Sequence, residues 1–292
     1  MDLAALPPAF LLTAAALLGL VVGSFLNVLI LRLPARLQAE FAAACAELAG
    51  EETAQPPPNR WFGLDYLIRP GSRCPSCGHA IRAWENIPVL SWLLLRARCS
   101  ACGTRIGVRY PLVELLTGLL TLAVAWRFGF DLRTLAVAVL VWGLIALAVI
   151  DIDEQLLPDV LTLPLLWLGL LFNLDGGFVP LKDAVIGAVA GYLSLWLVFQ
   201  LFRLLTGREG MGYGDFKLLA LFGAWLGWQM LPQILLVSSV AGALVGGTLM
   251  ALRRLPGGQP IPFGPWLILG GLVALFWGER INQAYLQLAG LA

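Results

Sequence analysis

Two groups of acidic residues lie directly beside apolar runs of the sequence. Asp151 ends one run and is followed by Asp153 and Glu154, whereas Asp215 closes Gly212-Tyr213-Gly214-Asp215 just before another. Keeping a carboxylate charged at the edge of the hydrocarbon core costs free energy, so a carboxylate at this position is a candidate functional residue. Two such carboxylates held close together share a proton. The ionised one can then take a proton from water, while the protonated one donates its proton to a carbonyl oxygen. Asp151 and Asp215 are therefore our candidates for the catalytic pair of an aspartyl peptidase.

The residues around this pair suggest how a peptide could be bound. Gly212 and Gly214 leave space beside Asp215, where an extended substrate backbone could approach closely. Asp153 and Glu154 could attract basic residues of a substrate. For these two acids, a solvated loop end is the alternative interpretation.

Helix capping is an alternative role for the acidic residues at the ends of the apolar runs. Asp159 follows Pro158 at the start of an apolar run, where N-capping is its expected role. Asp151 and Asp215 could cap helices as well. A metal site made of these acids is a further alternative, but the histidines that usually complete transition-metal sites are missing.

Four cysteines form two C-x-x-C pairs with 21 residues between them. Gly78 and Gly103 directly follow the pairs, at positions where a positive φ is often required. Four thiolates complete the tetrahedral coordination of Zn²⁺, so the pattern predicts a closed, structural zinc site that folds a small domain. Its ligands would be Cys74, Cys77, Cys99 and Cys102. Reduced cysteines or two disulfides are the alternatives, and a cytosolic location argues against disulfides.

Two residues near the cysteine pairs stand outside this pattern. Cys45 is expected to be a small packing residue. His79 adjoins Cys77 but is not needed as a ligand, and we expect it to be a solvated surface histidine.

The composition indicates that these candidate residues are positioned by membrane helices. Of the 292 residues, 59% are hydrophobic and only 13% are charged, about half the charged share of a soluble domain. The net charge of +1 gives no reason to expect a nucleic-acid partner. The single histidine provides no Ser-His or Cys-His dyad inside the apolar segments.

Apolar runs long enough to cross a bilayer recur along the chain. We expect an all-α polytopic membrane protein with about eight transmembrane helices, two of them short, and we detect no internal repeat. The expected spans lie near residues 10–31, 111–128, 133–150, 160–174, 183–204, 216–230, 233–252 and 263–279. Residues 1–31 would form the first transmembrane helix, 32–109 a cytosolic zinc-ribbon-like domain, and 110–292 the multi-helix membrane domain.

The basic residues predict the orientation in the membrane. The hydrophilic block 32–109 holds ten of the 19 lysines and arginines. Alternating the helices places fifteen basic residues on the side of this block and four on the other, which predicts that the block and both acidic groups face the cytosol. The first apolar run precedes Arg32 and Arg36, the charge order of a retained helix with its N-terminus outside rather than of a signal peptide.

Inside the hydrophilic block the composition changes. Residues 36–52 are rich in alanine and glutamate and are expected to be helical. Gln55 to Asn59 include three consecutive prolines and predict an extended linker.

Six motifs in this order resemble the type IV prepilin peptidases over nearly the whole chain. They are Gly23-Ser24-Phe25-Leu26-Asn27-Val28 with Arg32-Leu33-Pro34, the cysteine pairs with Glu85-Asn86-Ile87-Pro88, Tyr110-Pro111-Leu112-Val113-Glu114, the segment from Asp151 to Leu157-Pro158-Asp159, Gly210-Met211-Gly212-Tyr213-Gly214-Asp215-Phe216-Lys217, and Pro260-Ile261-Pro262-Phe263-Gly264-Pro265.

The resemblance implies an enzyme of the bacterial inner membrane with catalytic aspartates at Asp151 and Asp215. It implies cleavage after a glycine, which removes the short basic leaders of type IV prepilins and type II secretion pseudopilins. It further implies methylation of the new N-terminal amine with S-adenosylmethionine. The family commonly has glycine where Ala97 stands, in the region linked to methylation. Because the block contains no G-x-G-x-x-G turn, we name no residues that bind S-adenosylmethionine.

Two other classes of protein explain part of the pattern. A transporter would use membrane acids to relay protons or bind cations, usually near mid-span and in related halves. A zinc-ribbon membrane scaffold without catalysis would depend on the cysteines and tolerate the loss of Asp151 and Asp215.

Overall fold

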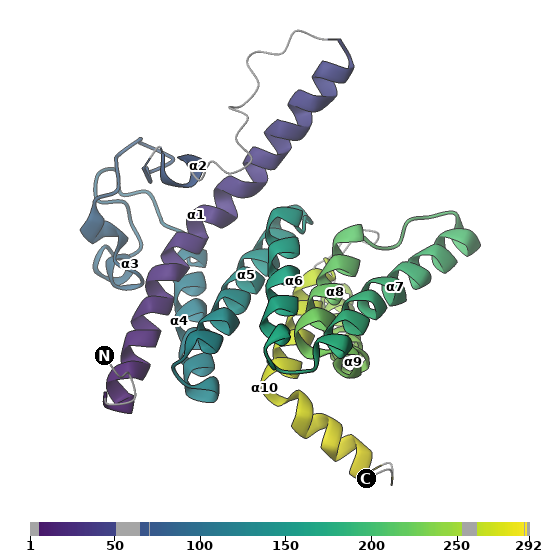
Figure 1. Cartoon of the computed structure of the whole chain (residues 1–292). Coiled ribbons are helices and arrows are strands. Elements are labelled where there is room, and N and C mark those ends of the chain that lie inside the picture. Colours follow the sequence, from purple (N-terminus) through teal and green to yellow (C-terminus); the bar gives the residue numbers. More distant parts are fainter. Residues whose placement is uncertain (1–5, 51–64, 70, 253–261, 289, 291–292) are drawn as a thin grey trace. The chain divides into compact units, whose positions relative to one another are not determined.

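The computed structural model describes residues 6–50, 65–69, 71–252, 262–288 and 290. These residues form helices (Figure 1). Two isolated β-bridges, Arg73 with Ala80 and Arg98 with Arg105, lie in the cysteine-rich segment. The longer helices are α1 (Pro8–Leu48), α4 (Arg109–Phe128), α5 (Leu132–Glu154), α6 (Asp159–Leu174), α7 (Leu181–Thr206), α8 (Tyr213–Leu226), α9 (Leu231–Ala251) and α10 (Gly264–Leu288). The short ones are α2 (Asp65–Ile68), η2 (Ala83–Asn86), α3 (Leu90–Leu94) and η3 (Trp228–Met230).

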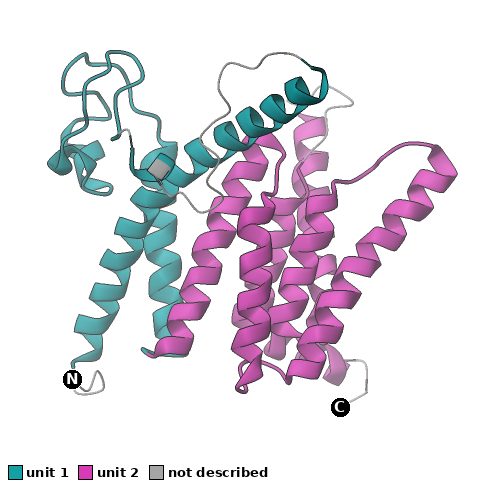
Figure 2. Cartoon of the chain, turned by 45° about the horizontal axis from the view of Figure 1, so that its top comes forward, with its two compact units in different colours: residues 1–130 teal, residues 131–292 magenta. Residues whose placement is uncertain are grey.

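The chain divides into two compact units, drawn in different colours in Figure 2. Unit 1 covers Met1–Phe130 and contains the cysteine pairs. Unit 2 covers Asp131–Ala292 and contains Asp151 and Asp215. Each group of candidate residues therefore lies within one unit.

All eight expected spans coincide with a long helix, so the all-helical architecture is confirmed. Among the described residues, five helices are long and apolar enough to cross a membrane: α1, α4, α5, α7 and the segment Trp228–Ala251 that contains α9. The 14-residue helix α8 is about 21 Å long, shorter than a hydrocarbon core of about 30 Å. All of its residues except Tyr213, Gly214 and Lys217 are buried. Its apolar run therefore reflects a position in the helical core of unit 2.

Helix α1 is longer than the sequence suggested. Its 41 residues extend over about 60 Å, twice the thickness of the hydrocarbon core. The helix continues through Pro34 to Leu48, so the expected helix over 36–52 is the continuation of the first span. The linker expected at 55–59 lies outside the described residues.

Small residues allow close helix packing in both units. A Cβ on Gly23 of α1 would lie 2.6 Å from the Cα of Glu114 in α4, and Gly187 of α7 faces Gly223 of α8 just as closely. The Asn27 side chain adds a 3.1 Å hydrogen bond from α1 to the carbonyl of Tyr110 in α4. Close backbone approach with a few interhelical hydrogen bonds is how helices associate in membranes.

The connection that follows α3 contains two consecutive left-handed residues. Arg96 has a φ of 52° and Ala97 a φ of 57°, a conformation that is unfavourable for any residue with a Cβ. Two backbone hydrogen bonds fix Ala97, one to the Trp92 carbonyl at 2.8 Å and one from the Ile106 N–H at 2.7 Å. The glycine that the resembled family has here would be free of this strain.

We expect Ala97→Gly to stabilise the cysteine-rich segment by about 0.5–1 kcal/mol. The left-handed conformation costs alanine roughly 1–2 kcal/mol, and the greater chain entropy of glycine offsets part of the gain. Amide hydrogen exchange over residues 71–107 should slow by about two- to fivefold. The control is Ala83→Gly in η2, whose φ is not left-handed and which should speed exchange. Unchanged or faster exchange in Ala97→Gly would contradict the strain argument.

Candidate active site and metal centre

Asp151 occupies the last turn of α5 and is buried, with 6% of its surface exposed. The helix ends three residues later, where Gln155 adopts a left-handed conformation and donates its N–H to the Asp151 carbonyl at 3.0 Å. Among the described residues, the Asp151 Oδ2 atom has no hydrogen-bond partner. A buried carboxylate oxygen without a partner is unusual in a purely structural role.

Asp215 is also buried, with 7% of its surface exposed, in the first turn of α8. Its backbone N–H lies 3.3 Å from the Gly212 carbonyl. Asp151 is the charged group that acts electrostatically on the Asp215 carboxylate. The positive end of the α8 dipole favours a negative charge at this position.

Leu157 links the surroundings of the two aspartates. A Cβ on Gly214 would lie 2.7 Å from the Leu157 Cβ, and a Cβ on Gly264 would lie 3.3 Å from Leu157 Cδ1. The same Gly264 Cβ would lie 2.5 Å from Asp151 Oδ2. The first residue of α10 therefore packs directly against the Asp151 carboxylate, and the residue before Asp215 packs against Leu157.

The residues expected to bind substrate beside the two aspartates differ in their surroundings. Asp153 and Glu154 are exposed at the end of α5, consistent with either a substrate-facing or a solvated position. Gly212 leaves open space, because its Cβ would approach nothing closer than Asp215 Oδ2 at 4.0 Å. Gly214, in contrast, is required by its contact with Leu157, a packing role that the sequence did not reveal.

The N-capping role expected for Asp159 is wrong. Asp159 is the first residue of α6, the cap position is occupied by Pro158, and no side chain caps the helix. Instead, both carboxylate oxygens of Asp159 accept hydrogen bonds from Lys217 Nζ at 2.7 Å. This ion pair joins the first turns of α6 and α8, two residues beyond Asp215.

The four cysteines of the two pairs converge in unit 1. Their sulfur atoms lie within 4.8 Å of one another, and Cys74 Sγ is 3.8 Å from Cys102 Sγ. Tetrahedral zinc with Zn–S bonds of about 2.3 Å places its sulfurs about 3.8 Å apart. The four side chains can therefore hold a metal ion. The Thr104 hydroxyl, 3.2 Å from Cys102 Sγ, and the Thr104 backbone lower the pKa of Cys102 to about 6.

The two cysteine pairs form knuckles of the same geometry. Gly78 and Gly103 both have a φ of 72°, as the sequence predicted. The Gly78 N–H donates to the Cys74 carbonyl at 2.9 Å, and the Gly103 N–H donates to the Cys99 carbonyl at 3.0 Å. This repeated turn points both thiols of each pair toward one centre.

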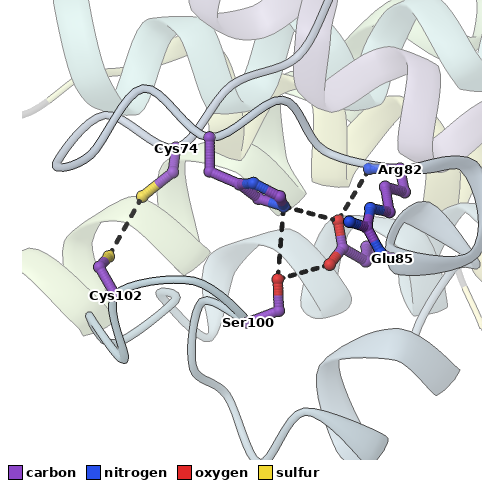
Figure 3. Close-up of polar contacts among 6 residues, drawn as sticks. Cys74, Arg82, Glu85, Ser100 and Cys102 are labelled. Atoms are coloured by element: carbon purple, nitrogen blue, oxygen red, sulfur yellow. Dashed lines mark hydrogen bonds and ion pairs between the residues drawn. The ribbon is translucent and has the colours of Figure 1, made fainter.

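A polar cluster connects the two knuckles beside the cysteines. The Glu85 carboxylate accepts hydrogen bonds from the Arg82 N–H at 2.8 Å and the Ser100 hydroxyl at 2.5 Å (Figure 3). His79 Nε2 lies 3.3 Å from the same carboxylate. The Arg82 N–H, the Ser100 hydroxyl and His79 hold the pKa of Glu85 below its usual range. His79 is therefore part of this cluster rather than a solvated surface residue.

Cys45 does not have the packing role expected of it. The structure places this cysteine exposed on the extension of α1. The sequence also did not predict that Gly264 contacts Asp151. The only available signal was the motif around Gly264, because the two residues are far apart in the chain.

Two family models match consecutive parts of the chain. Residues 17–128 match the family model of the bacterial peptidase A24 N-terminal domain, and residues 138–247 match that of the type IV leader peptidase family.

Relatives named prepilin leader peptidase/N-methyltransferase are similar to almost the entire chain. Those from Stutzerimonas stutzeri and Pseudomonas aeruginosa are each 55% identical, covering 99% of this chain and 98% and 97% of the relatives. One from Aeromonas hydrophila is 56% identical over 92% of each chain. No solved structure is significantly similar. On the two matching family models and these nearly full-length relatives, the chain belongs to the type IV leader peptidase family.

Proposed function

We propose that this protein removes the leader peptide from type IV prepilins and type II secretion pseudopilins by hydrolysis at Asp151 and Asp215. The ionised aspartate would take a proton from water, and the protonated one would donate to the scissile carbonyl oxygen. The observation that carries the proposal is the burial of two interacting carboxylates from different helices, one with an unpartnered oxygen.

The surroundings of the pair support a peptide substrate. The open space at Gly212 adjoins Asp215 and would accept an extended backbone ahead of the cut. Gly214 would contribute indirectly, because its contact with Leu157 sets the position of α8. The exposed Asp153 and Glu154 would attract the basic residues of the leader, an attraction that salt would weaken.

We also propose an inner-membrane location with the cysteine domain and the aspartates on the cytoplasmic side. The excess of basic residues on that side supports it. A substrate helix in the bilayer would then present its leader at the same boundary as the aspartates. After the cut, S-adenosylmethionine would supply the methyl group for the new N-terminal amine, as the names of the relatives suggest.

Replacing either aspartate by asparagine should reduce leader removal by at least about 10²-fold, because each variant lacks one partner of the proton exchange. Asparagine has nearly the same shape, so Asp151→Asn and Asp215→Asn should still insert into membranes. Cleavage of a purified prepilin by the detergent-solubilised protein is the measurement. Asp175→Asn, at the exposed end of α6, is the matched control and should cleave normally. Normal cleavage by Asp215→Asn would refute the mechanism.

Gly264→Ala should lower the turnover number by about 10²-fold while the protein still inserts and folds. The new methyl group would meet Asp151 Oδ2 at 2.5 Å, so the carboxylate must move, and displacements of about 1 Å can cost that much. The control is Gly247→Ala in α9, where a Cβ would meet nothing within 4 Å. If both variants cleave equally well, the contact with Gly264 does not position Asp151.

We further propose that the metal held by the four cysteines is structural zinc, because four thiolates leave no open coordination position. Elemental analysis should find about one zinc ion per chain, and a strong chelator should increase hydrogen exchange across residues 71–107. Cys77→Ser should lose the ion, whereas Cys45→Ser should retain it, since Cys45 lies outside the cluster. Retention of full zinc by Cys77→Ser would contradict this assignment.

A further inference from the structure

A group of polar side chains lies at the end of unit 2 that is opposite the two aspartates. Helix α8 carries Asp215 in its first turn and ends at Leu226, and η3 and the start of α9 follow it directly. Two glutamines occupy these following turns, Gln229 in η3 and Gln233 in the first turn of α9. The segment Trp228–Ala251 is helical throughout, so the two glutamines, four residues apart, are neighbours on one side of a helix.

Gln233 is buried, with 8% of its surface exposed. Its amide oxygen and its amide nitrogen are both shielded from solvent, and neither has a hydrogen-bond partner among the described residues. The residues beside it, Leu231 and Ile234, are buried as well. An amide without hydrogen bonds in apolar surroundings costs free energy, and buried polar groups are nearly always paired with protein or with ordered water. The Gln233 amide therefore points to a bound molecule.

The Gln229 amide has a partner at one end only. Its nitrogen donates to Asp183 Oδ2, in the first turn of α7, at 3.2 Å. Its oxygen is shielded from solvent, and no donor in the described part of the chain reaches it. Backbone encloses this oxygen, because a Cβ on Gly227 would lie 2.7 Å from it. A Cβ on Gly187 of α7 would lie 2.8 Å from the Trp228 nitrogen, so the beginning of α7 packs closely against η3.

Helix α10 also reaches this end of unit 2. Met230 lies between the two glutamines in the chain, and its sulfur accepts a 3.6 Å hydrogen bond from the Asn282 amide of α10. A Cβ on Gly278 of α10 would lie 2.9 Å from the same sulfur. The other end of α10, at Gly264, lies against the Asp151 carboxylate. The turns that carry the glutamines therefore contact both α7 and α10.

The chemistry of the unpaired amide atoms identifies the kind of molecule that fits. The oxygens of Gln229 and Gln233 need hydrogen-bond donors, whereas the Gln233 nitrogen needs an acceptor. A cation would pair with the oxygens and leave the Gln233 N–H groups unpaired, and an anion would do the reverse. A small neutral molecule with a hydroxyl group both donates and accepts. Water is the smallest of these, and a buried water needs about two to four polar partners.

We propose that Gln229 and Gln233 form a binding site for ordered water that joins the start of α9 to α7. Cβ atoms four residues apart on a helix are about 5–6 Å from each other, a separation that one water between the two amides can bridge. The water accepts a hydrogen bond from the Gln233 nitrogen and donates one to the Gln229 oxygen, while Asp183 holds the other end of the Gln229 amide. The inference does not depend on the proposed hydrolysis, because it involves neither substrate nor reaction.

The bound water is tested by water-edited solid-state NMR on the full-length protein in liposomes. Magnetisation is transferred from water protons to glutamine side-chain amides labelled with ¹⁵N, at mildly acidic pH, where chemical exchange of these amides is slow. The Gln233 signal is assigned by its loss in Gln233→Met. It should receive magnetisation from water, as the signal of the exposed Gln283 of α10 does. No transfer to Gln233 would overturn the proposal, and transfer from lipid protons instead would replace water by a lipid hydroxyl.

Thermal unfolding of Gln233→Met distinguishes a hydrated amide from a dry one. Methionine has nearly the same size as glutamine and requires no hydrogen bonds. If water binds the amide, the substitution removes its hydrogen bonds and leaves the Gln229 oxygen without a donor, so Tm should fall by about 3–6 °C. If the amide has no partner, its removal relieves a buried unpaired group. An unchanged or higher Tm would therefore contradict the proposed site.

The matched control is Gln283→Met, the same substitution at an exposed position of α10, which should change Tm by no more than about 2 °C. Gln229→Met and the double variant with Gln233→Met then test whether the two amides share one water. Because Gln229→Met also removes the hydrogen bond to Asp183, its Tm should be the lower of the two single variants. The double variant should lose little more than Gln229→Met alone, since the bridge is already broken. Fully additive losses would show that no water joins the two glutamines.

Discussion

The arrangement of unit 2 depends on holding two mutually repelling carboxylates, Asp151 and Asp215, out of bulk water at the edge of a membrane domain. Burial favours a single negative charge on the pair, since two charges in a region of low dielectric repel strongly. Asp215 lies in the first turn of α8, and Gly264, the first residue of α10, lies against the Asp151 carboxylate; the positive end of a helix dipole favours a negative charge at such positions. The first residue of α10 can approach the Asp151 carboxylate closely because Gly264 has no side chain that would displace it.

Contacts with α6 hold helix α8 at both of its ends. At one end, Lys217 pairs with Asp159, an exposed ion pair that contributes no more than about 1 kcal/mol. At the other end, the Asn173 amide donates to the carbonyls of Ala224 and Trp225 at 2.8 and 3.0 Å, and the Trp225 indole donates to the Leu165 carbonyl at 2.9 Å. In lipid, such buried hydrogen bonds fix helix register more effectively than exposed charge pairs.

Sequence reasoning located every long helix because a lipid environment requires continuous apolar segments, and the cysteine spacing predicted the metal cluster. It could not show that α8 is buried on nearly all sides within unit 2, because the apolar pattern is the same for a helix that faces lipid and for one inside a protein. It assigned Asp159 to capping because capping is a local interaction, whereas Lys217 is distant in the chain. The packing roles of Gly214 and Gly264 depend likewise on long-range contacts.

Units 1 and 2 differ in the partners that surround their carboxylates. In unit 2, Asp151 and Asp215 interact with each other electrostatically. In unit 1, Glu85 and Glu114 each accept a hydrogen bond from a backbone N–H. For Glu85, the hydrogen bonds to the charged form hold the pKa of the carboxyl group below its usual range. The two units therefore provide different environments for their carboxylates, an electrostatically interacting pair in unit 2 and separate groups bound to backbone N–H groups in unit 1.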